Sequence, residues 1–281
     1  MADSPLDNAS ALECLVDGQP AVTLSVLDRG LSYGDGVFET LRVAHGHIGL
    51  LEYHMARLRR GLCALRLTVD LVEITSELNA VAQRLHNGII KLTLTRGTGP
   101  RGYAMPNTAQ PTRICQSLPP AAYPAERFSA GITLFECQTR LAVQPLLAGI
   151  KHLNRLEQVL ARSEWTDPAY AEGLVRDIGG DVIECTMSNL FIRHDDRWIT
   201  PDLRGCGVQG VMRDYLIDRL GESGQPVVVR SIDYATVLQS TEIFCCNSLY
   251  GVWPIVGLAD ISWPVGPQTR HAQALAEQVI K

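Results

Sequence analysis

The sequence predicts an α+β protein built from two units, because helical and strand patterns fall into two blocks with a proline-rich segment between them. Its 281 residues suit two domains of ordinary size. Hydrophobic residues make up 46% of the chain and charged residues 20%. The chain therefore has enough apolar material for a core and too little charge for disorder.

The first unit, residues 1–118, is expected to combine a sheet with two amphipathic helices. Apolar residues recur at helical spacing over 51–65 and again over 71–85. Asp70, with Glu73 three residues later, is typical of a capping box at the start of the second helix. Alternating or continuous apolar runs predict strands at 22–26, 37–43, 89–95 and 112–118.

The second unit, residues 132–281, is expected to be richer in strands than the first. The segment at 119–131 contains three prolines and a break in composition, so it is the expected linker. Asn154, with Glu157 three residues on, predicts the N-cap of a helix. Strands are expected at 132–137, 173–178, 181–184, 189–193, 227–230 and 242–246, and helices at about 154–165 and 210–220.

Charge and composition argue against several classes of protein. A formal net charge of -5 disfavours nonspecific nucleic-acid binding, which depends on clustered Lys and Arg. No run approaches the roughly 20 apolar residues of a membrane span, and MADSPLDNAS has no signal-peptide pattern, so a cytoplasmic location is expected. The eight cysteines form no C-x-x-C pair, so we expect buried reduced thiols rather than a metal site or a disulfide framework.

Lys151 is the first residue that suggests a chemistry. It follows the apolar run LLAGI and precedes a helical pattern, so a strand-to-helix junction is expected there. Partial burial lowers the pKa of a lysine from its usual value of about 10.4 and favours the neutral amine, which can form a Schiff base. Lysines beside apolar segments also commonly extend to water, so this position alone leaves both roles open.

Two further segments contain groups that suit a charged cofactor. Glu184 ends a short predicted strand, and a carboxylate there can hold a protonated pyridine nitrogen, although a surface glutamate at a strand end is the alternative. In GCGVQGVMRDYL, glycines precede a helix that starts near Val211. The backbone N–H groups and the dipole of such a helix start favour an anion.

Five segments resemble, in order and spacing, the fold-type IV pyridoxal-phosphate enzymes: GDGVFET (34–40), HMARL (54–58), KHLNRLEQVLARS (151–163), ECTMSNLF (184–191) and GVQGVMR (207–213). The resemblance covers roughly residues 15–256. It implies pyridoxal 5'-phosphate as the cofactor, a smaller N-terminal α/β domain, and a strand-rich C-terminal pseudo-barrel domain that carries the cofactor lysine. Trp198 departs from the family pattern, which usually has an aliphatic residue or Phe there, and a packing change is expected.

The resemblance assigns a role to each matching residue. It implies that Lys151 is the Schiff-base lysine and that Glu184 is the partner of the pyridine nitrogen. Arg57 looks like the phosphate-binding arginine, a role that suits a bidentate guanidinium, while His54 is expected to be a packed helix histidine. The other implied phosphate contacts are the backbone of Val211 and Met212 and the hydroxyl of Ser248.

Within the family, KHLNRLEQVL and the loop TRGTGPRGY resemble the aminodeoxychorismate lyases. Phe38 stands where D-amino-acid aminotransferases have a tyrosine that helps to bind the substrate carboxylate. Arg101 aligns with a carboxylate-binding arginine that the neighbouring subunit donates in those enzymes, and Tyr103 stands where they have a histidine. Arg155 is equally well interpreted as a substrate contact or as a solvated surface residue.

The resemblance therefore implies a homodimeric lyase that acts on a small molecule, converting 4-amino-4-deoxychorismate to 4-aminobenzoate and pyruvate in folate biosynthesis. Lys151 is expected to remove the C4 proton before the C3 ether bond breaks. A D-amino-acid or branched-chain aminotransferase on the same scaffold remains the alternative. A second alternative is a catalytically silent protein that binds pyridoxal phosphate.

Overall fold

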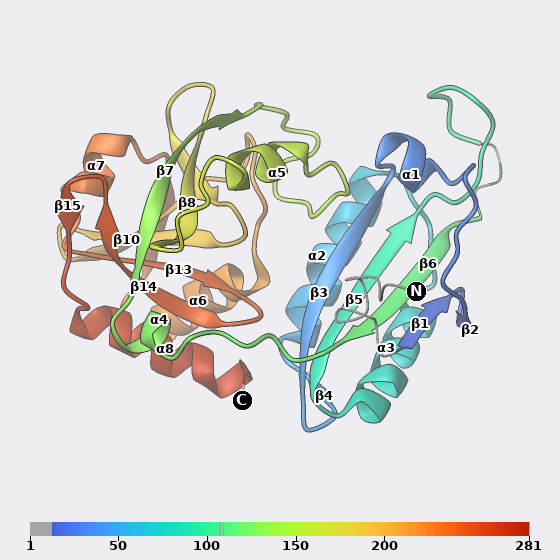
Figure 1. The fold of residues 1–281 in the computed structure, drawn as a ribbon, viewed down its shortest axis with the longest axis horizontal. Coiled ribbons are helices and arrows are strands. Elements are labelled where there is room, and N and C mark those ends of the chain that lie inside the picture. The colour runs from blue at the N-terminus through green and yellow to red at the C-terminus, as the bar shows by residue number, and fades with distance from the viewer. Residues whose placement is uncertain (1–12, 107, 109, 281) are drawn as a thin grey trace, which may run out of the picture. The chain divides into compact units, whose positions relative to one another are not determined.

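The computed structural model describes residues 13–106, 108 and 110–280, which form two compact units (Figure 1). The first unit comprises the chain up to Ala122 together with Lys151–Asn154, and the second comprises Tyr123–Ile150 and the chain from Arg155 onward. The N-terminal segment MADSPLDNAS, in which no signal-peptide pattern was found, lies outside the described residues. No helix in the described part of the chain has the length and apolar character of a membrane span.

The first unit contains a six-stranded antiparallel sheet in the order β2-β1-β6-β5-β3-β4. Its long central strands were predicted from the sequence. In β3 the predicted alternation is present, since every second residue is buried against the core. The strands are β1 (Glu13–Val16), β2 (Gln19–Pro20), β3 (Gly36–Ala44), β4 (His47–Ile48), β5 (Gly88–Thr95) and β6 (Thr112–Leu118).

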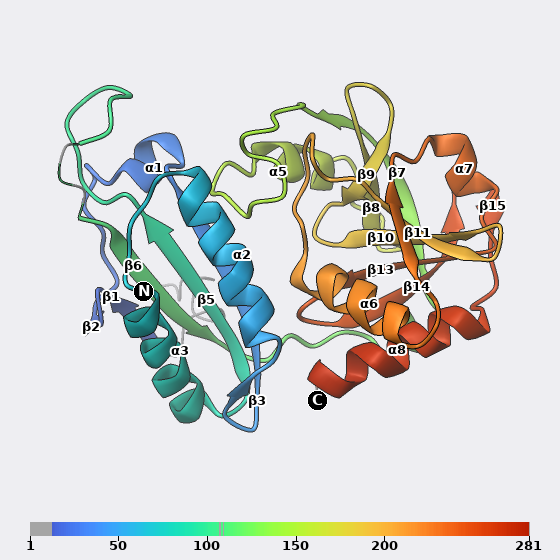
Figure 2. The same ribbon diagram turned by 180° about the vertical axis from the view of Figure 1, so that it is seen from behind.

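Two helices, α2 (Leu51–Ala64) and α3 (Leu71–Leu85), lie side by side on one face of this sheet (Figure 2). Both helices were predicted, and their apolar stripes bury Leu58 and Leu78 in the core of the first unit. A short helix, α1 (Arg29–Tyr33), precedes β3. The side chain of Asp70 caps α3 as predicted, by accepting from the backbone N–H groups of residues 72 and 73.

The prediction of a strand at 22–26 is wrong. This segment is irregular, and the side chains of Val22 and Val26 are exposed. Its apolar residues therefore have no core to face in the single chain. The composition of this segment favours a strand locally, but among the described residues no strand pairs with it.

The second unit contains a nine-stranded mixed sheet in the order β12-β11-β10-β13-β14-β7-β8-β9, with β15 paired to β14. Its last strand, β9, contacts β10 and β11, so the sheet curls back on itself. The strands are β7 (Ile132–Leu141), β8 (Tyr170–Asp177), β9 (Val182–Cys185), β10 (Asn189–His194), β11 (Arg197–Pro201), β12 (Val227–Arg230), β13 (Glu242–Asn247), β14 (Gly251–Leu258) and β15 (Ile261–Ser262).

Five helices accompany this second sheet. The helix predicted over about 210–220 is present as α6 (Val211–Glu222), and it contacts the C-terminal helix α8 (Pro267–Ile280), which in turn contacts β13 and β14. Helix α8 was not predicted. The remaining helices are α4 (Glu126–Ser129), α5 (Leu156–Arg162) and α7 (Tyr234–Leu238).

The prediction that Asn154 caps α5 is wrong. The helix begins at Leu156, with Arg155 in the N-cap position and no side-chain cap hydrogen bond. The Asn154 side chain instead donates from Nδ2 to the backbone oxygen of Gly34, at 3.1 Å. A long-range contact within the first unit therefore uses the group that a local cap would have used.

The division into units differs from the expected domains in one respect. The change from the first unit to the second at 122 and 123 lies within the expected linker at 119–131. Lys151, however, groups with the first unit, whereas it was expected in the strand-rich one. The reason is a set of backbone hydrogen bonds between residues 151–153 and the start of β3.

All eight cysteines carry free thiols, and six of them are buried. Burial raises the pKa of the Cys115 and Cys137 thiols to about 12. These thiols are therefore protonated at neutral pH and act as small apolar side chains in the cores.

Candidate active site

Lys151 lies beside the first residues of β3, in the first unit. The backbone N–H of Phe38 donates to the Lys151 oxygen at 2.9 Å, and the N–H of Leu153 donates to the Gly36 oxygen at 3.0 Å. These two bonds hold residues 151–153 against the strand. The Lys151 amine lies 4.4 Å from the centre of the Phe38 ring, within the range of a cation–π contact.

The GDG motif at 34–36 makes room for this arrangement. Gly34 has a φ of 63°, in the left-handed region that favours glycine. A Cβ atom at Gly34 would lie 2.7 Å from Oδ1 of Asn154. The motif therefore permits the close approach of residues 151–154, which places the Lys151 side chain beside Phe38.

A buried carboxylate, Glu39, organises the two basic residues of α2 that the sequence singled out. Nε of Arg57 donates to Oε1 of Glu39 at 2.8 Å, and Nη2 of Arg57 donates to Oε2. Nδ1 of His54 lies 2.7 Å from Oε2 of the same carboxylate. All three side chains are at most 5% exposed, so this is a buried network, and His54 is a bonded as well as a packed residue.

The charges in this network can be assigned. Burial alone would raise the pKa of Glu39, but Arg57 and His54 bring it down to about 2. Burial lowers the pKa of His54, and the positive charges of Arg57 and Lys151 lower it further, against the opposing effect of Glu39. Glu39 is therefore ionised and His54 is neutral at neutral pH. Since Glu39 is an acceptor only, the His54 proton sits on Nδ1.

The loop that contains Arg101 and Tyr103 is anchored by a second cluster of charges in the first unit. Arg29 donates from Nε to Asp35 at 2.9 Å and from Nη1 to the Gly102 oxygen at 3.0 Å. Tyr103 is 87% exposed, and the Arg101 side chain is exposed with no hydrogen bond or ion pair to any described residue. The loop backbone is therefore held at Gly102, while the side chains of its two neighbours, Arg101 and Tyr103, face solvent.

Glu184 lies on β9 in the second unit and is 5% exposed. Its Oε2 accepts a hydrogen bond from the backbone N–H of Val208 at 2.7 Å, and its Oε1 lies 3.4 Å from Nε2 of Gln158. The sequence alternative of a surface glutamate does not hold. The carboxylate is oriented from two sides, by the glycine-rich loop before α6 and by α5.

Arg155 is half-buried and lies near Glu184 within the second unit. Burial lowers the pKa of Arg155, and the negative charges of Glu184 and Glu157 oppose this effect. A solvated surface arginine would show no such burial. Arg155 is therefore placed with the candidate site residues, although its contact with a substrate remains a proposal.

The start of α6 has the features of an anion site. Its N-cap residue, Gly210, has no side chain and therefore offers no capping acceptor to the first N–H groups of the helix. Asn189 holds the preceding loop, by accepting from the Gly210 N–H at 3.0 Å and donating to the Val208 oxygen at 2.8 Å. A Cβ at Gly210 would lie 2.0 Å from Oδ1 of Asn189, which explains the glycine. Val211 and Met212 are the first two helical residues.

Ser248 lies in the turn between β13 and β14. Asn247 shapes this turn, because its side-chain oxygen accepts from the backbone N–H groups of Leu249 and Tyr250 at 2.9 and 3.1 Å.

Each unit thus brings together its own set of the predicted residues. In the first unit, Phe38 and Lys151 are in contact, and the neighbouring Glu39 holds Arg57 and His54. In the second unit, Glu184 lies near Arg155 and accepts a hydrogen bond from the loop before α6. That helix begins with Val211 and Met212.

Glu39, Gln158 and Asn189 each hold a candidate residue in place and were not among the predicted site residues. A signal for Glu39 was present in the sequence. In the predicted strand at 37–43, alternation places Glu39 on the same face as the buried Val37 and Leu41. A carboxylate on a core face requires a basic partner, and the helix that follows supplies Arg57.

Comparison with known proteins places the chain in a family. The model of the family amino-transferase class IV matches residues 36–258, and the chain belongs to this family. The chain is 34% identical to the aminodeoxychorismate lyase of Vibrio harveyi, over 92% of this chain and 97% of that protein. It is 25% identical to the D-alanine aminotransferase of Bacillus licheniformis, over 95% and 93% of the two chains.

Among solved structures, the chain is similar to the 4-amino-4-deoxychorismate lyase of Pseudomonas aeruginosa. The TM-score is 0.93 at 48% sequence identity, covering 95% of this chain and 100% of that one. The resemblance stated from the sequence, and the α+β fold class with it, is confirmed.

Proposed function

We propose that this chain is a pyridoxal-phosphate-dependent lyase that converts 4-amino-4-deoxychorismate to 4-aminobenzoate and pyruvate. The observation that carries the proposal is the 48% identity to the Pseudomonas aeruginosa lyase over the whole of that chain. The similarity to the D-alanine aminotransferase is lower, at 25% identity. This difference in identity favours the lyase over a D-alanine aminotransferase.

The residues present fit pyridoxal phosphate. The chain contains only three lysines, at 91, 151 and 281, so few amines compete for the cofactor aldehyde. Lys151 would bind the aldehyde, and Glu184 would bind the pyridine nitrogen through its buried carboxylate. The phosphate would be bound by Arg57, by the backbone N–H groups of Val211 and Met212, and by the hydroxyl of Ser248.

When bound, this cofactor withdraws electrons from the carbon next to the substrate amine. Glu184 supports that effect because it holds a proton at the ring nitrogen. The Lys151 amine removes the proton from C4 of the substrate. Breakage of the C3–O bond then releases enolpyruvate and leaves an aromatic ring, and a proton returned to enolpyruvate converts it to pyruvate.

The substrate carries a ring carboxylate, which requires a cation. Arg101 and Arg155 are the proposed partners, with Tyr103 as a neighbouring contact in the loop. Arg101 has no partner among the described residues of its own chain, which suits a residue that acts in a second copy. We therefore propose a homodimer in which this loop contributes to the neighbouring site.

Phe38 would distinguish the reaction from that of an aminotransferase. Its ring contacts the Lys151 amine and carries no hydroxyl with which to bind a substrate carboxylate. A D-amino-acid aminotransferase remains the second candidate function, because the same lysine and carboxylate would serve it.

The test is to incubate the purified protein with 4-amino-4-deoxychorismate and measure 4-aminobenzoate. Wild type and Lys91→Ala should form it, whereas Lys151→Ala should not. Lys91 is the matched control because its amine also lies near Phe38, at 5.9 Å from the ring centre. Borohydride reduction and peptide mapping should place the pyridoxyl group on Lys151. A label on Lys91, or activity that survives Lys151→Ala, would overturn the assignment.

A further inference from the structure

Arg29 lies on α1 in the first unit, and the reaction proposed above gives it no role. Its side chain is charged and yet only 4% exposed. Nη1 donates to the Gly102 oxygen at 3.0 Å, and Nη2 donates to the Tyr103 oxygen at 3.4 Å. A buried arginine thus binds two consecutive carbonyl groups of the segment at 97–105, the Arg101 loop.

The third side of the same guanidinium binds Asp35. Nε of Arg29 donates to Oδ2 of Asp35 at 2.9 Å. Asp35 is held in turn by Arg96, whose Nε and Nη2 donate to the two carboxylate oxygens at 2.8 and 3.0 Å. A planar guanidinium that is bonded through Nε to a fixed carboxylate has a fixed orientation. Asp35 therefore directs Nη1 and Nη2 of Arg29 at the Arg101 loop.

Tyr33, also on α1, makes a second set of contacts with the loop. Its hydroxyl accepts from the Gly102 N–H at 3.1 Å. Its ring centre lies 4.8 Å from the guanidinium carbon of Arg29 and 5.5 Å from the ring centre of Tyr103, which it meets edge-on. A Cβ at Gly99 would lie 2.9 Å from Cδ of Arg29, so the loop backbone passes directly over that side chain. Both backbone groups of Gly102 are thus bonded to α1.

Asp28, just before α1, fixes the two strand ends from which the loop departs. Its Oδ2 accepts from the hydroxyl of Thr95, at the end of β5, at 2.8 Å. The same oxygen accepts from the hydroxyl of Thr112, at the start of β6, at 3.0 Å. The loop is therefore held at its base by Asp28 and in its middle by Arg29.

A loop that is already held in the free protein binds a ligand more tightly than a mobile loop with the same side chains. A mobile loop loses backbone freedom when one of its residues binds, and that loss weakens affinity. The Arg101 side chain is exposed, and its backbone neighbour Gly102 is the point that α1 holds. A contact that is equally strong in the ground state and the transition state affects KM and leaves kcat unchanged.

We propose that Arg29 is a positioning residue, which holds the Arg101 loop so that Arg101 can bind the ring carboxylate of the substrate. Tyr33 shares this role through the Gly102 N–H. The proposal rests on the proposed function, because the substrate of that reaction supplies the carboxylate. Arg29 acts through the loop, so its loss should weaken substrate binding and leave cofactor binding and bond breakage intact.

The first test measures KM, kcat and cofactor affinity for the holoenzyme with 4-amino-4-deoxychorismate. In Arg29→Gln, KM should rise at least about fivefold while kcat stays within about twofold of wild type. Asp35 keeps Arg96 as its partner in this variant, so no carboxylate is left unpaired. Tyr33→Phe should raise KM by less, because it removes one acceptor and keeps the ring. Absorbance titration of the cofactor should give the wild-type affinity in both variants.

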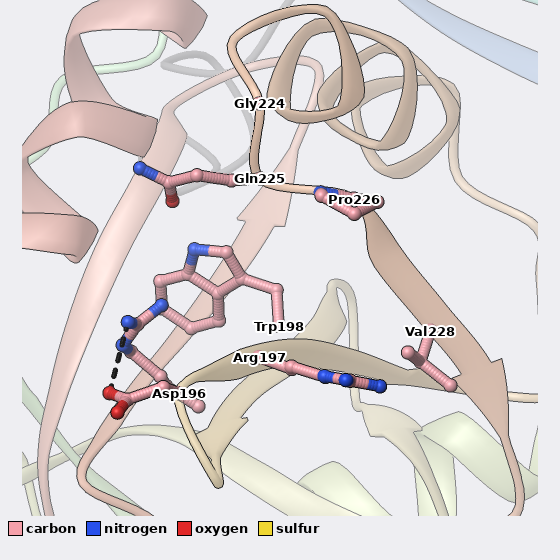
Figure 3. A pocket seen from close by; sticks show the side chains of 8 residues that line it. Asp196, Arg197, Trp198, Gly224, Gln225, Pro226 and Val228 are labelled. Atoms are coloured by element: carbon pink, nitrogen blue, oxygen red, sulfur yellow. Dashed lines mark hydrogen bonds and ion pairs between the residues drawn. The ribbon is translucent and has the colours of Figure 1, made fainter.

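The matched control is Arg197→Gln. Arg197 is an exposed arginine that lines a cavity in the second unit (Figure 3), away from the contacts of the Arg101 loop. This variant should keep the wild-type KM and kcat.

The second test needs no activity. Trypsin cuts after arginine, and the bond between residues 101 and 102 can be cut only when the loop opens locally. Cleavage after Arg101, followed by mass spectrometry, should be at least about fivefold faster in Arg29→Gln and less accelerated in Tyr33→Phe. Other tryptic sites should be cut at wild-type rates, as should every site retained in Arg197→Gln.

KM and the cleavage rate must rise together. A rise in only one of them, a fall in kcat with KM unchanged, or weaker cofactor binding would overturn the proposal. If Arg29→Gln failed to fold, Tyr33→Phe would decide by the same two measurements. If wild type formed no 4-aminobenzoate, the proposed function would fail, whereas the cleavage rates would still show whether Arg29 and Tyr33 hold the loop.

Discussion

Glu39 accepts hydrogen bonds from Arg57 at both of its carboxylate oxygens, from Nε to Oε1 at 2.8 Å and from Nη2 to Oε2. The pair is buried, and the same carboxylate also binds His54. Glu39 touches no reacting atom in the proposed reaction. It is a positioning residue, because it fixes the plane in which the Arg57 guanidinium lies.

The ionised state of Glu39 should appear in the pH dependence of stability. Its folded pKa of about 2 lies below the ordinary 4.5, so its contribution is present above pH 4.5 and is lost as the pH falls towards 2. A shift of this size corresponds to on the order of 3 kcal/mol. In urea unfolding, the free energy of unfolding of Glu39→Gln should lack the part of the decrease between pH 4.5 and 2 that Glu39 causes in wild type. Glu13→Gln, which changes a more exposed pair with Arg84, should keep it. Parallel curves for Glu39→Gln and wild type would contradict the assignment.

His54 should add a second pH dependence to the free energy of unfolding, at higher pH than that of Glu39. Burial holds the pKa of His54 below its usual value, so the folded protein keeps it neutral while the unfolded chain takes up a proton below about pH 6.5. The free energy of unfolding should therefore fall as the pH drops below about 6.5. The slope should be absent in His54→Asn and present in the control His47→Asn, which changes an exposed histidine. If His54→Asn kept the full slope, His54 would be charged in the folded state.

Glu184→Ala should separate cofactor binding from chemistry. The phosphate contacts persist in this variant, so cofactor should remain bound, but the ring nitrogen loses its counter-charge. We expect the formation of 4-aminobenzoate to slow about a hundredfold or more, the size of effect seen when one electrostatic contact to a reacting system is removed. Glu157→Ala is the control, since Glu157 accepts from the Ala142 backbone instead. Unchanged turnover in Glu184→Ala would make this carboxylate structural.

The parts of the fold that follow from periodicity were predictable. The helices at 51–65 and 71–85 and the strand at 37–43 each repeat their apolar residues over several turns or pleats, and the structure confirms them. The segment at 22–26 has the same local propensity but no partner strand. Propensity alone could not reveal that absence.

The contacts that could not be predicted are those between residues far apart in the sequence. Asn154 satisfies the rule for a helix cap, yet Gly34, 120 residues earlier, is its partner. Similarly, Arg57 was recognised from its motif, but its carboxylate partner lies on a strand and was overlooked. The candidate residues could be selected from the sequence because motifs are local. The residues that hold them could not, because those contacts depend on how the strands and helices pack.

The proposed dimer can be tested by complementation. Lys151→Ala and Arg101→Ala should each be inactive alone, and a mixture that exchanges subunits should recover part of the activity. Each mixed dimer would assemble one intact site from the good parts of both chains. A mixture of Lys151→Ala with Glu184→Ala should recover nothing, since both residues act in the same subunit. No recovery in the first mixture, after proven exchange, would place Arg101 in its own subunit's site or outside it.

The most direct test of the proposed function is the stoichiometry of products without a keto-acid acceptor. With 4-amino-4-deoxychorismate alone, the protein should turn over repeatedly and release pyruvate and 4-aminobenzoate in equal amounts, because breaking one C–O bond yields both. With D-alanine or a branched-chain L-amino acid, the absorbance of the lysine-bound cofactor should decay slowly or not at all. Rapid decay with either amino acid, and no 4-aminobenzoate from the first substrate, would contradict the lyase and make the protein an aminotransferase.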